Sequence, residues 1–318
     1  MIMNSVLSST KDNSIQNNQK KKLFINTKLN EKNQSNKNSI NNEINSKKIQ
    51  KKERIILSDD TVYEGYIKNN EFNGYGEYKS PKYNYYGYYL NGKKNGKGEL
   101  EDIENNLKYV GDFKNDMKDG FGEEEYYDGS RYIGQFKENK KNGEGNLILV
   151  GGDGESLRGY SGEFRNDKIW GKGKFIWNDN KEYIGDWVND EITGYGIIRE
   201  GKLKHLGFFE HNLKEGIGAT FYDEQNFVLS GKWENNLIEG YGILINLEDK
   251  DKNNNNIDAN NNNEIIVKMG KGEIINKSLD EDEINKFKKS EEYGNIIELY
   301  KEKFYPDYIK YMNNKSIF

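Results

Sequence analysis

Several residue types and motifs are scarce or absent in the sequence. The 318 residues include no cysteine and only two histidines. The missing cysteine excludes disulfides, thiolate metal sites, palmitoylation and prenylation. No apolar run approaches the roughly 18 residues of a membrane-spanning helix. The start, Met1-Ile-Met-Asn-Ser, lacks the charged and apolar regions of a signal peptide, and position 2 is not the glycine that myristoylation requires. We therefore expect an intracellular protein in the cytoplasm, at the cytoskeleton or cilium, or peripherally attached to a membrane.

Hydrophobic residues are also scarce. They make up 33% of the chain, charged residues make up 32%, and the mean hydropathy is -1.05. A chain of this length with so few apolar side chains is not expected to build a conventional two-layer core. The 23 tyrosines are the main source of apolar area, because a tyrosine ring packs while its hydroxyl reaches water.

A short repeat fills the middle of the sequence. Eight units begin 22 to 24 residues apart, with one gap of 28, and a period this short indicates a repeat architecture. In each unit a glycine follows two residues after the start, a mostly aromatic position lies two residues further on, and a Gly-x-Gly pair follows at eleven and thirteen residues. The first residues of the units are Tyr63, Tyr85, Tyr109, Tyr132, Tyr160, Tyr183, His205 and Leu229.

The spacing within a unit predicts a β-hairpin. Alternation by two residues puts the start, the first glycine and the second aromatic residue on one face of a strand. The Gly-x-Gly half alternates in the same way, and between the halves lie turn-forming pairs such as Asn69-Asn70 and Asn189-Asp190. Glycine weakens a strand, so these glycines need a packing reason, and we expect large rings to lie across them. Residues assigned to this structural register include Tyr63, Gly65, Gly74, Gly76, Tyr109, Gly111, Phe113, Tyr132, Gly134, Phe136, Tyr183, Gly185, Trp187, Gly194, Gly196 and Trp233.

This register resembles the MORN (membrane occupation and recognition nexus) repeat. Tyr183-Ile-Gly185-Asp-Trp187-Val-Asn189-Asp190, followed by Gly194-Tyr-Gly196-Ile-Ile198, matches the repeat pattern almost throughout. Units seven and eight begin with His205 and Leu229 instead of tyrosine, and Thr220 and Glu124 stand at closing positions that are normally hydrophobic. The resemblance implies a mainly β fold, an elongated, twisted antiparallel meander of hairpins in a single layer, with sixteen strands in the eight units.

Sequence composition predicts five segments. Residues 1–54 carry 12 basic and 4 acidic residues, 12 asparagines and no glycine, and we expect a disordered arm. Residues 55–247 form the repeat array, 248–264 an asparagine-rich insertion loop, and 265–277 a partial ninth repeat, in which Gly270-Lys-Gly272 looks like a second half. Residues 278–318 form a helical tail, with a capping box at Ser278 and Glu281 and a helical spacing of apolar residues up to Pro306. The tail either caps the sheet or binds a partner.

Nothing in the sequence predicts catalysis, a cofactor or a metal site. Both histidines, His205 and His211, fall in the seventh unit, where filling of the core or surface is the simpler interpretation. The Gly-x-Gly pairs recur with the hairpin period and do not open a helix after a strand, so they do not indicate a phosphate-binding loop. The flanking segments are also too short for the enzyme domains that accompany some MORN arrays, and we expect a non-enzymatic protein.

The favoured hypothesis is a scaffold for protein–protein interaction. MORN arrays in known families serve at the cytoskeleton, in cilia and flagella, and in cortical membrane skeletons, which implies cytoskeletal or membrane-skeleton partners. A single-layer sheet cannot bury both faces, so aromatic residues on the second face would mark a partner site. Alternatively, these residues cover neighbouring glycines or the C-terminal helix. The candidates are Tyr66, Tyr75, Tyr88, Phe121, Tyr195, Phe208 and Tyr241.

A competing hypothesis is peripheral binding of acidic phospholipid through the basic arm and basic loop residues. The candidate lipid contacts are Lys93, Lys94, Lys140, Lys141, Lys172 and Lys174. Homodimerisation through the edge of the last hairpin is a third possibility, and nucleic acid is not an expected partner.

Overall fold

The computed structural model describes residues 52–58, 60–150, 157–247, 264–276 and 279–313. Most of the predicted arm (1–54) and asparagine-rich loop (248–264) lies outside these residues. The arm prediction was wrong at its end, because residues 52–54 belong to the first strand, β1, whose partner is the first strand of the repeat array.

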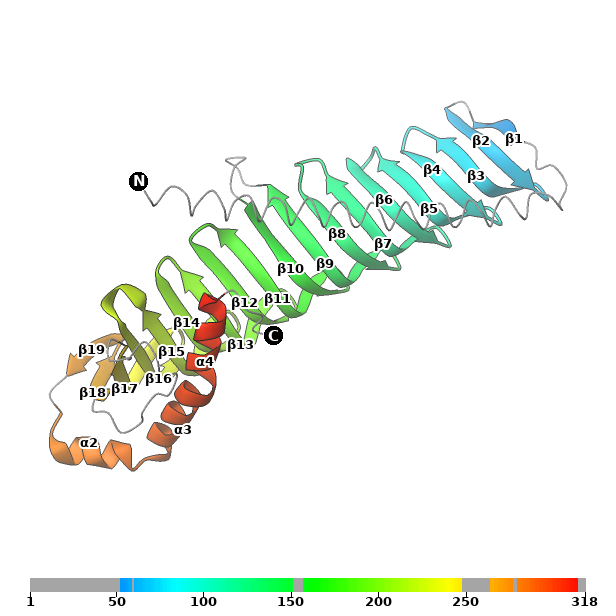
Figure 1. Cartoon of the computed structure of the whole chain (residues 1–318). Helices are drawn as coiled ribbons and strands as arrows, with labels where there is room; N and C mark the ends of the chain where they lie inside the picture. Colours follow the sequence, from blue (N-terminus) through cyan, green and yellow to red (C-terminus); the bar gives the residue numbers. More distant parts are fainter. Residues whose placement is uncertain (1–51, 59, 151–156, 248–263, 277–278, 314–318) are drawn as a thin grey trace. The chain divides into compact units, whose positions relative to one another are not determined.

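The described residues form one antiparallel sheet of nineteen strands (Figure 1). Each strand from β2 to β18 pairs with the strand before it and the strand after it in the chain, and β1 and β19 are the edges, so the sheet is an open meander. The strands are β1 (Lys52–Ser58), β2 (Thr61–Lys68), β3 (Glu71–Lys79), β4 (Tyr83–Leu90), β5 (Lys93–Asp102), β6 (Leu107–Lys114), β7 (Met117–Tyr126), β8 (Arg131–Lys137), β9 (Lys140–Val150), β10 (Leu157–Arg165), β11 (Lys168–Asn178), β12 (Lys181–Val188), β13 (Glu191–Glu200), β14 (Leu203–Glu210), β15 (Leu213–Tyr222), β16 (Phe227–Glu234), β17 (Leu237–Asn246), β18 (Glu264–Gly270) and β19 (Glu273–Asn276).

The eight sequence units are the eight hairpins from β2–β3 to β16–β17, so the predicted β meander is confirmed. Strand β1 precedes them, and a ninth hairpin, β18–β19, follows. The interpretation of Gly270-Lys-Gly272 as the second half of a unit was wrong. Lys271 and Gly272, with φ of 53° and 77°, form the turn of the ninth hairpin, and the four-residue strand β19 follows that turn.

The repeat tyrosine of each hairpin lies across two facing glycines. Gly65 of β2 and Gly76 of β3 are cross-strand partners, and a Cβ atom on either would lie 2.7 Å from the Cζ atom of Tyr63. Any side chain at these positions would therefore displace the ring. Tyr63, Tyr85, Tyr109, Tyr132 and Tyr183 are fully buried in this way. We call the surface that carries these rings the ring face, and the opposite surface the second face.

The hydroxyl of the same tyrosine bonds to a backbone bulge. The strand pairing shifts directly after each first glycine, for example between Gly65 and Ile67, so the backbone of the intervening residue lacks regular ladder bonds. The Tyr63 hydroxyl donates to the carbonyl of Tyr66 at 2.9 Å, and Tyr109 donates to Asp112 at 2.9 Å. One side chain thus fills the gap over the glycines and satisfies the exposed carbonyl.

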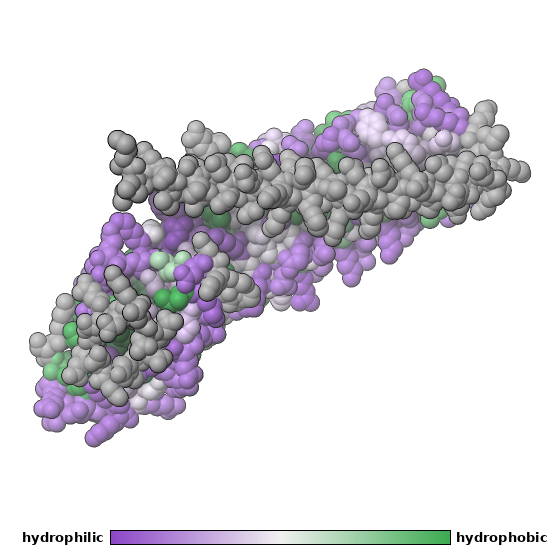
Figure 2. Space-filling view, in the orientation of Figure 1, coloured by the Kyte–Doolittle hydropathy of each residue, from purple (hydrophilic) through white to green (hydrophobic). Residues whose placement is uncertain are grey.

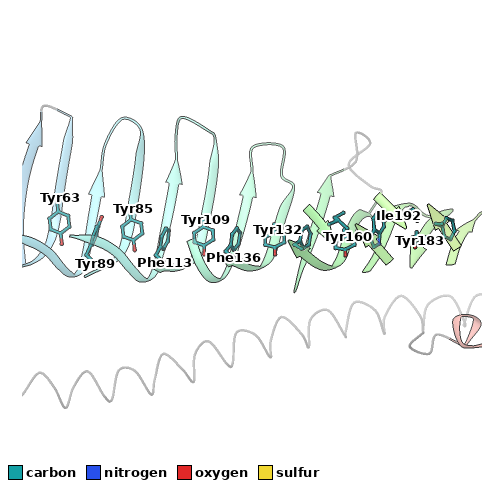
Figure 3. Packing of buried hydrophobic residues seen from close by; sticks show 14 residues of the cluster. Tyr63, Tyr85, Tyr89, Tyr109, Phe113, Tyr132, Phe136, Tyr160, Tyr183 and Ile192 are labelled. Carbon is teal, nitrogen blue, oxygen red and sulfur yellow. The ribbon is translucent and has the colours of Figure 1, made fainter. Parts of the chain in front are cut away.

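Rings continue from hairpin to hairpin on the ring face. Tyr109 meets Phe113 of its own hairpin and Phe136 of the next one edge to face, with both centroid distances at 5.1 Å. Figure 3 shows the alternating row from Tyr63 through Tyr85, Phe113, Tyr109 and Phe136 to Tyr132. Edge-to-face contacts of this kind stabilise beyond simple area burial.

The hairpin turns clasp neighbouring hairpins, that is, each turn from the second hairpin to the eighth is hydrogen-bonded to the hairpin before it. Both turn residues have positive φ, as at Asn115 (50°) and Asp116 (70°), which matches the two-residue turns that Asn and Asp favour. The second turn residue also reaches the preceding hairpin: Asp116 donates its N–H to the carbonyl of Lys94 at 3.0 Å, and its carboxylate accepts the Lys94 N–H at 2.8 Å. Asn139, Asp167, Asp190, Asn212 and Asn236 make the same two bonds.

The unusual residues of the repeat pattern are paired with each other or with neighbours. His205 and Thr220 are cross-strand partners, and their side chains are 2.9 Å apart. Glu124, which is also buried, forms an ion pair with Lys118 and accepts a hydrogen bond from the Tyr126 hydroxyl at 2.6 Å. Polar residues therefore replace the normal hydrophobic contact in these units by a bonded pair.

The C-terminal helices cover the second face of the last third of the sheet (Figure 1). They are α2 (Glu281–Lys288), α3 (Glu291–Leu299) and α4 (Tyr305–Met312), with a π-helical turn, Tyr300–Phe304, between α3 and α4. Phe287 of α2 stacks on Tyr241 of β17, and Tyr308 of α4 stacks on Phe221 of β15 at 4.0 Å. The tail thus covers a face of the sheet and not its last edge.

Two sequence details of the tail differ in the structure. The N-cap of α2 is Asp280, whose side chain accepts the N–H of Glu283 at 2.8 Å, whereas Ser278 lies outside the described residues. Pro306 does not end the helical region but lies in the first turn of α4, where proline is tolerated because its nitrogen needs no helical partner.

The ring contact predicts that alanine is not tolerated at the facing glycines. A Cβ atom on Gly111 would lie 2.6 Å from the Cζ atom of Tyr109 and 2.6 Å from the Cα atom of Gly122. We expect Gly111→Ala to lower the free energy of unfolding by about 1–3 kcal/mol, measured by urea unfolding. The control is Gly294→Ala in α3, where nothing lies within 4 Å; it should be neutral or stabilising by about 0.5–1 kcal/mol. Equal effects would contradict this packing role.

Candidate interaction surface

In the middle hairpins a polar side chain beside the bulge accepts a hydrogen bond from a backbone N–H of the adjacent strand. Three residues after the unit start, Asp112 accepts the N–H of Phe121 at 3.1 Å, and Asp186 accepts the N–H of Tyr195 at 3.2 Å. Gln135 and Glu163 do the same in their hairpins. An acid or amide at this position therefore has a structural role on the second face.

The first, second and seventh hairpins place an aromatic residue at that position instead: Tyr66, Tyr88 and Phe208. Tyr88 pairs across the strands with Tyr75, and their ring centroids are 5.7 Å apart at 79°. Tyr75 is 43% and Tyr88 44% exposed. Tyr88 is therefore exposed at the position where four other hairpins carry a polar side chain that accepts a backbone N–H.

Six of the seven predicted partner residues are at least partly accessible, and Tyr195 is the buried one. Tyr66 is half-buried, and Tyr75, Tyr88, Phe121 and Phe208 are exposed. Phe121 also lines a hollow of about 480 Å³ between the third and fourth hairpins, together with Lys114, Asp119 and Gln135. The coloured surface in Figure 2 is otherwise mostly hydrophilic, and hydrophobic residues appear in separate spots.

Two predicted partner residues contact the chain's own helices, although one of them, Tyr241, remains half-buried. Tyr195 is buried, stacks on Phe304, and donates its hydroxyl to Asp307 of α4 at 2.9 Å. Tyr241 stacks on Phe287, and its hydroxyl donates to Glu283 of α2 at 2.8 Å. At these two positions the structure matches the alternative interpretation, contact with the C-terminal helix.

The predicted lipid-contacting lysines do not form one patch. Lys94 lies on the ring face with its Nζ 4.3 Å from the Tyr83 ring, and Lys141 lies 5.3 Å from the Tyr132 ring. Burial lowers the pKa of both lysines, with Asp116 and Glu124 respectively opposing this effect. Lys172 and Lys174 form ion pairs with Asp186 and Glu182. Only Lys93 and Lys140 of the six are classed as exposed and have no described ion pair.

Sequence reasoning missed three features of this region. It did not identify the polar side chain that accepts a backbone N–H beside the bulge, or the hydrogen bonds from the second turn residue to the preceding hairpin. It also missed the row of lysines over the rings of the ring face. The signal for the first was present, because acids or amides recur three residues after the start in four consecutive units. The cation–ring contacts had a similar signal, since Lys94, Lys118, Lys141 and Lys214 share one position in their units.

The two histidines and the carboxylates of the described residues do not gather into a metal site. The described residues contain no group of three or more His, Asp or Glu side chains that could hold a metal ion. His205 is packed between Phe209 and Trp233, and its Nε2 has no hydrogen-bond partner among the described atoms. His211 lies exposed on a turn, 2.8 Å from Glu191. No described helix is both long and apolar enough to cross a membrane.

Comparison with known families finds the MORN repeat. Seven segments match its model: residues 63–84, 85–102, 109–131, 132–154, 160–181, 183–199 and 230–245. The unmatched unit is the hairpin β14–β15, which carries His205 and Thr220 but has the same strand pairing as its neighbours. No enzyme family matches, and a comparison with curated proteins finds no match.

His205 predicts a pH dependence of stability. Burial, with Lys214 nearby, holds the pKa of His205 well below its usual value. The unfolded chain, with a histidine pKa near 6.5, therefore binds the proton more readily than the folded one. The stability that depends on neutral His205 is present above about pH 6.5 and is lost as the pH falls, by up to about 1.4 kcal/mol per pH unit.

The double variant His205→Tyr with Thr220→Leu restores the usual repeat residues and should flatten this loss between about pH 6.5 and pH 5, measured by urea unfolding at each pH. His211→Gln is the matched control. It removes the exposed histidine, whose pKa is raised by Glu191, and should retain the loss. An unchanged pH dependence in the double variant would assign the effect to another group.

Proposed function

The chain is a MORN-repeat protein, and on that premise we propose that it is a non-enzymatic scaffold that binds other proteins through the second face of its first three hairpins. The observation that carries this proposal is the exposure of Tyr75, Tyr88 and Phe121 on that face. Aromatic residues are enriched among the residues that contribute most to binding at protein interfaces.

The surroundings of these rings support a protein partner. Cross-strand ion pairs lie next to them on the same face, such as Lys97–Asp112 at 2.8 Å and Lys108–Glu99 at 2.6 Å. An apolar centre with a charged rim is the usual anatomy of a protein interface. The clasped and bonded hairpins keep this surface preformed, so little ordering of the backbone is needed on binding.

We place the scaffold at the cytoskeleton, in a cilium or flagellum, or in a cortical membrane skeleton, where the repeat family serves in other proteins. Peripheral binding of acidic phospholipid is the weaker candidate. Two of its six lysines lie over tyrosine rings and two are in ion pairs. The homodimer hypothesis concerns β19, an edge strand of only four residues, and stays a prediction.

Proximity labelling in the native cell tests the scaffold function. The full chain, fused to a biotin ligase, should label a defined set of cytoskeletal or membrane-skeleton proteins. The triple variant Tyr75→Ser, Tyr88→Ser and Phe121→Ser should lose most of that set, because interface aromatics typically contribute about 2 kcal/mol or more each. Tyr127→Ser, at an 85% exposed position in a turn, should change nothing.

The circular dichroism of the triple variant should retain its β signal, because the three side chains are not part of the ring face. An unchanged labelled set would refute binding through this surface. Loss of the fold would show instead that the three rings are structural.

A further inference from the structure

The sheet contains the same aromatic pair twice, once covered and once exposed. Tyr195 of the sixth hairpin pairs across the strands with Phe208 of the seventh, and Tyr75 of the first pairs with Tyr88 of the second. Tyr195 and Tyr75 occupy the same repeat position, and Phe208 and Tyr88 share another. Both pairs have a centroid distance of 5.7 Å, with interplanar angles of 61° and 79°. They are therefore two copies of one local surface.

The covered copy shows what this surface binds. Phe304 stacks parallel to Tyr195 at an interplanar angle of 8°, and Asp307, one helical turn later, accepts the tyrosine hydroxyl. The Nζ atom of Lys303 lies 4.0 Å from the centre of the same ring. A cation, an aromatic ring and a carboxylate thus meet one tyrosine from a single helical segment.

A second covered tyrosine repeats this recognition. Tyr241, at the equivalent position of the eighth hairpin, stacks on Phe287 at 4.5 Å, and Glu283 accepts its hydroxyl. Glu283 precedes Phe287 by four residues, again one helical turn. The combination of helical aromatic ring and carboxylate therefore recurs at independent places and does not depend on one helix.

The surroundings of the exposed copy differ in charge. Beside Tyr195 and Phe208 the next strand, β15, presents Ala219 and Phe221 to the helices. The equivalent positions beside Tyr75 and Tyr88, on β5, are Glu99 and Glu101. Glu99 forms an ion pair with Lys108 at 2.6 Å, and Glu101 accepts a hydrogen bond from the Asn84 side chain at 3.2 Å. An apolar helix surface would remove both carboxylates from water with only these partners, so an occupant that carries cations there is favoured.

We propose that the Tyr75–Tyr88 pair is the docking site for an amphipathic helix of a partner protein. The helix presents an aromatic ring to Tyr75, a carboxylate one turn away to its hydroxyl, and lysine or arginine side chains to Glu99 and Glu101. This inference rests on the proposed scaffold function and names the chemistry of its partner. The chain's own α3–α4 segment fits the aromatic pair but not the two glutamates, which disfavours a second copy as the occupant.

Two synthetic peptides test the proposal against the full chain. The first has the sequence of residues 290–313, and the second has the same sequence with Tyr300→Lys and Tyr308→Lys, the two residues that contact Phe221. Each peptide is held helical by a lactam bridge on its outward side, and circular dichroism verifies the helix. Fluorescence anisotropy of the labelled peptides measures binding.

We expect the lysine-bearing peptide to bind more tightly than the unmodified one, by about tenfold, and the preference to shrink at high salt. The double variant Tyr75→Ser with Tyr88→Ser should weaken its binding by about tenfold or more. Glu99→Gln with Glu101→Gln should remove the preference between the peptides. The control, Tyr127→Ser, should bind both peptides as the unaltered chain does.

Three results would overturn the proposal. Neither peptide binds, the Tyr75→Ser and Tyr88→Ser double variant binds the peptides as tightly as the unaltered chain, or the unmodified peptide binds more tightly than the lysine-bearing one. The second would mean that the peptide replaces the native helix on Tyr195, and the third would favour a second copy of the chain. Failure here is separable from failure of the scaffold function. If proximity labelling still depends on Tyr75 while the peptides do not bind, the surface has a partner of another chemistry.

Discussion

The contact between a tyrosine ring and two facing glycines is the constraint on which the rest of the structure depends. The ring needs the space of both missing side chains, and the hydroxyl needs the bulge carbonyl three residues later. These requirements fix the glycine positions, the bulge and the register of each hairpin together. A shift of one residue would turn the ring to the other face of the sheet.

This constraint leaves the second face free to vary. Its side chains form ion pairs and accept backbone N–H groups in the middle hairpins, form one exposed aromatic pair in the first two hairpins, and contact the helices in the last ones. The same backbone thus carries three kinds of surface. Differences between hairpins on this face change which side chains the surface presents, whereas differences on the ring face, such as His205 and Thr220, change the packing of the rings.

Much of the fold could be predicted from the sequence, because its determinants are local. The ring and glycine positions and the turn pairs all lie within one unit, so spacing alone revealed the hairpins. Strand β1 has no repeat signature, and the turn role of Gly270 to Gly272 depends on where β18 begins. Both were therefore missed.

The candidate site was less predictable, because its state depends on contacts between distant residues. Tyr75 and Tyr195 occupy the same repeat position, and their own units do not distinguish them. Only the docking of Phe304 and Asp307, more than 100 residues after Tyr195, makes one ring buried while the other remains exposed. The clasp from Asp116 to Lys94 was hidden for a similar reason, since it joins two units that the repeat pattern treats separately.

Because every strand pairs only with its neighbours in the chain, the number of hairpins is not fixed by closure or by any crossover. Duplicating or deleting one unit of the gene would add or remove one rung and leave all other pairings unchanged. Such events would alter the separation between the exposed aromatic pair and the helix-covered end in steps of two strands, about 10 Å each. If the chain acts as the scaffold proposed above, the spacing between its bound partners would change in such an event while the recognition of each partner stayed the same.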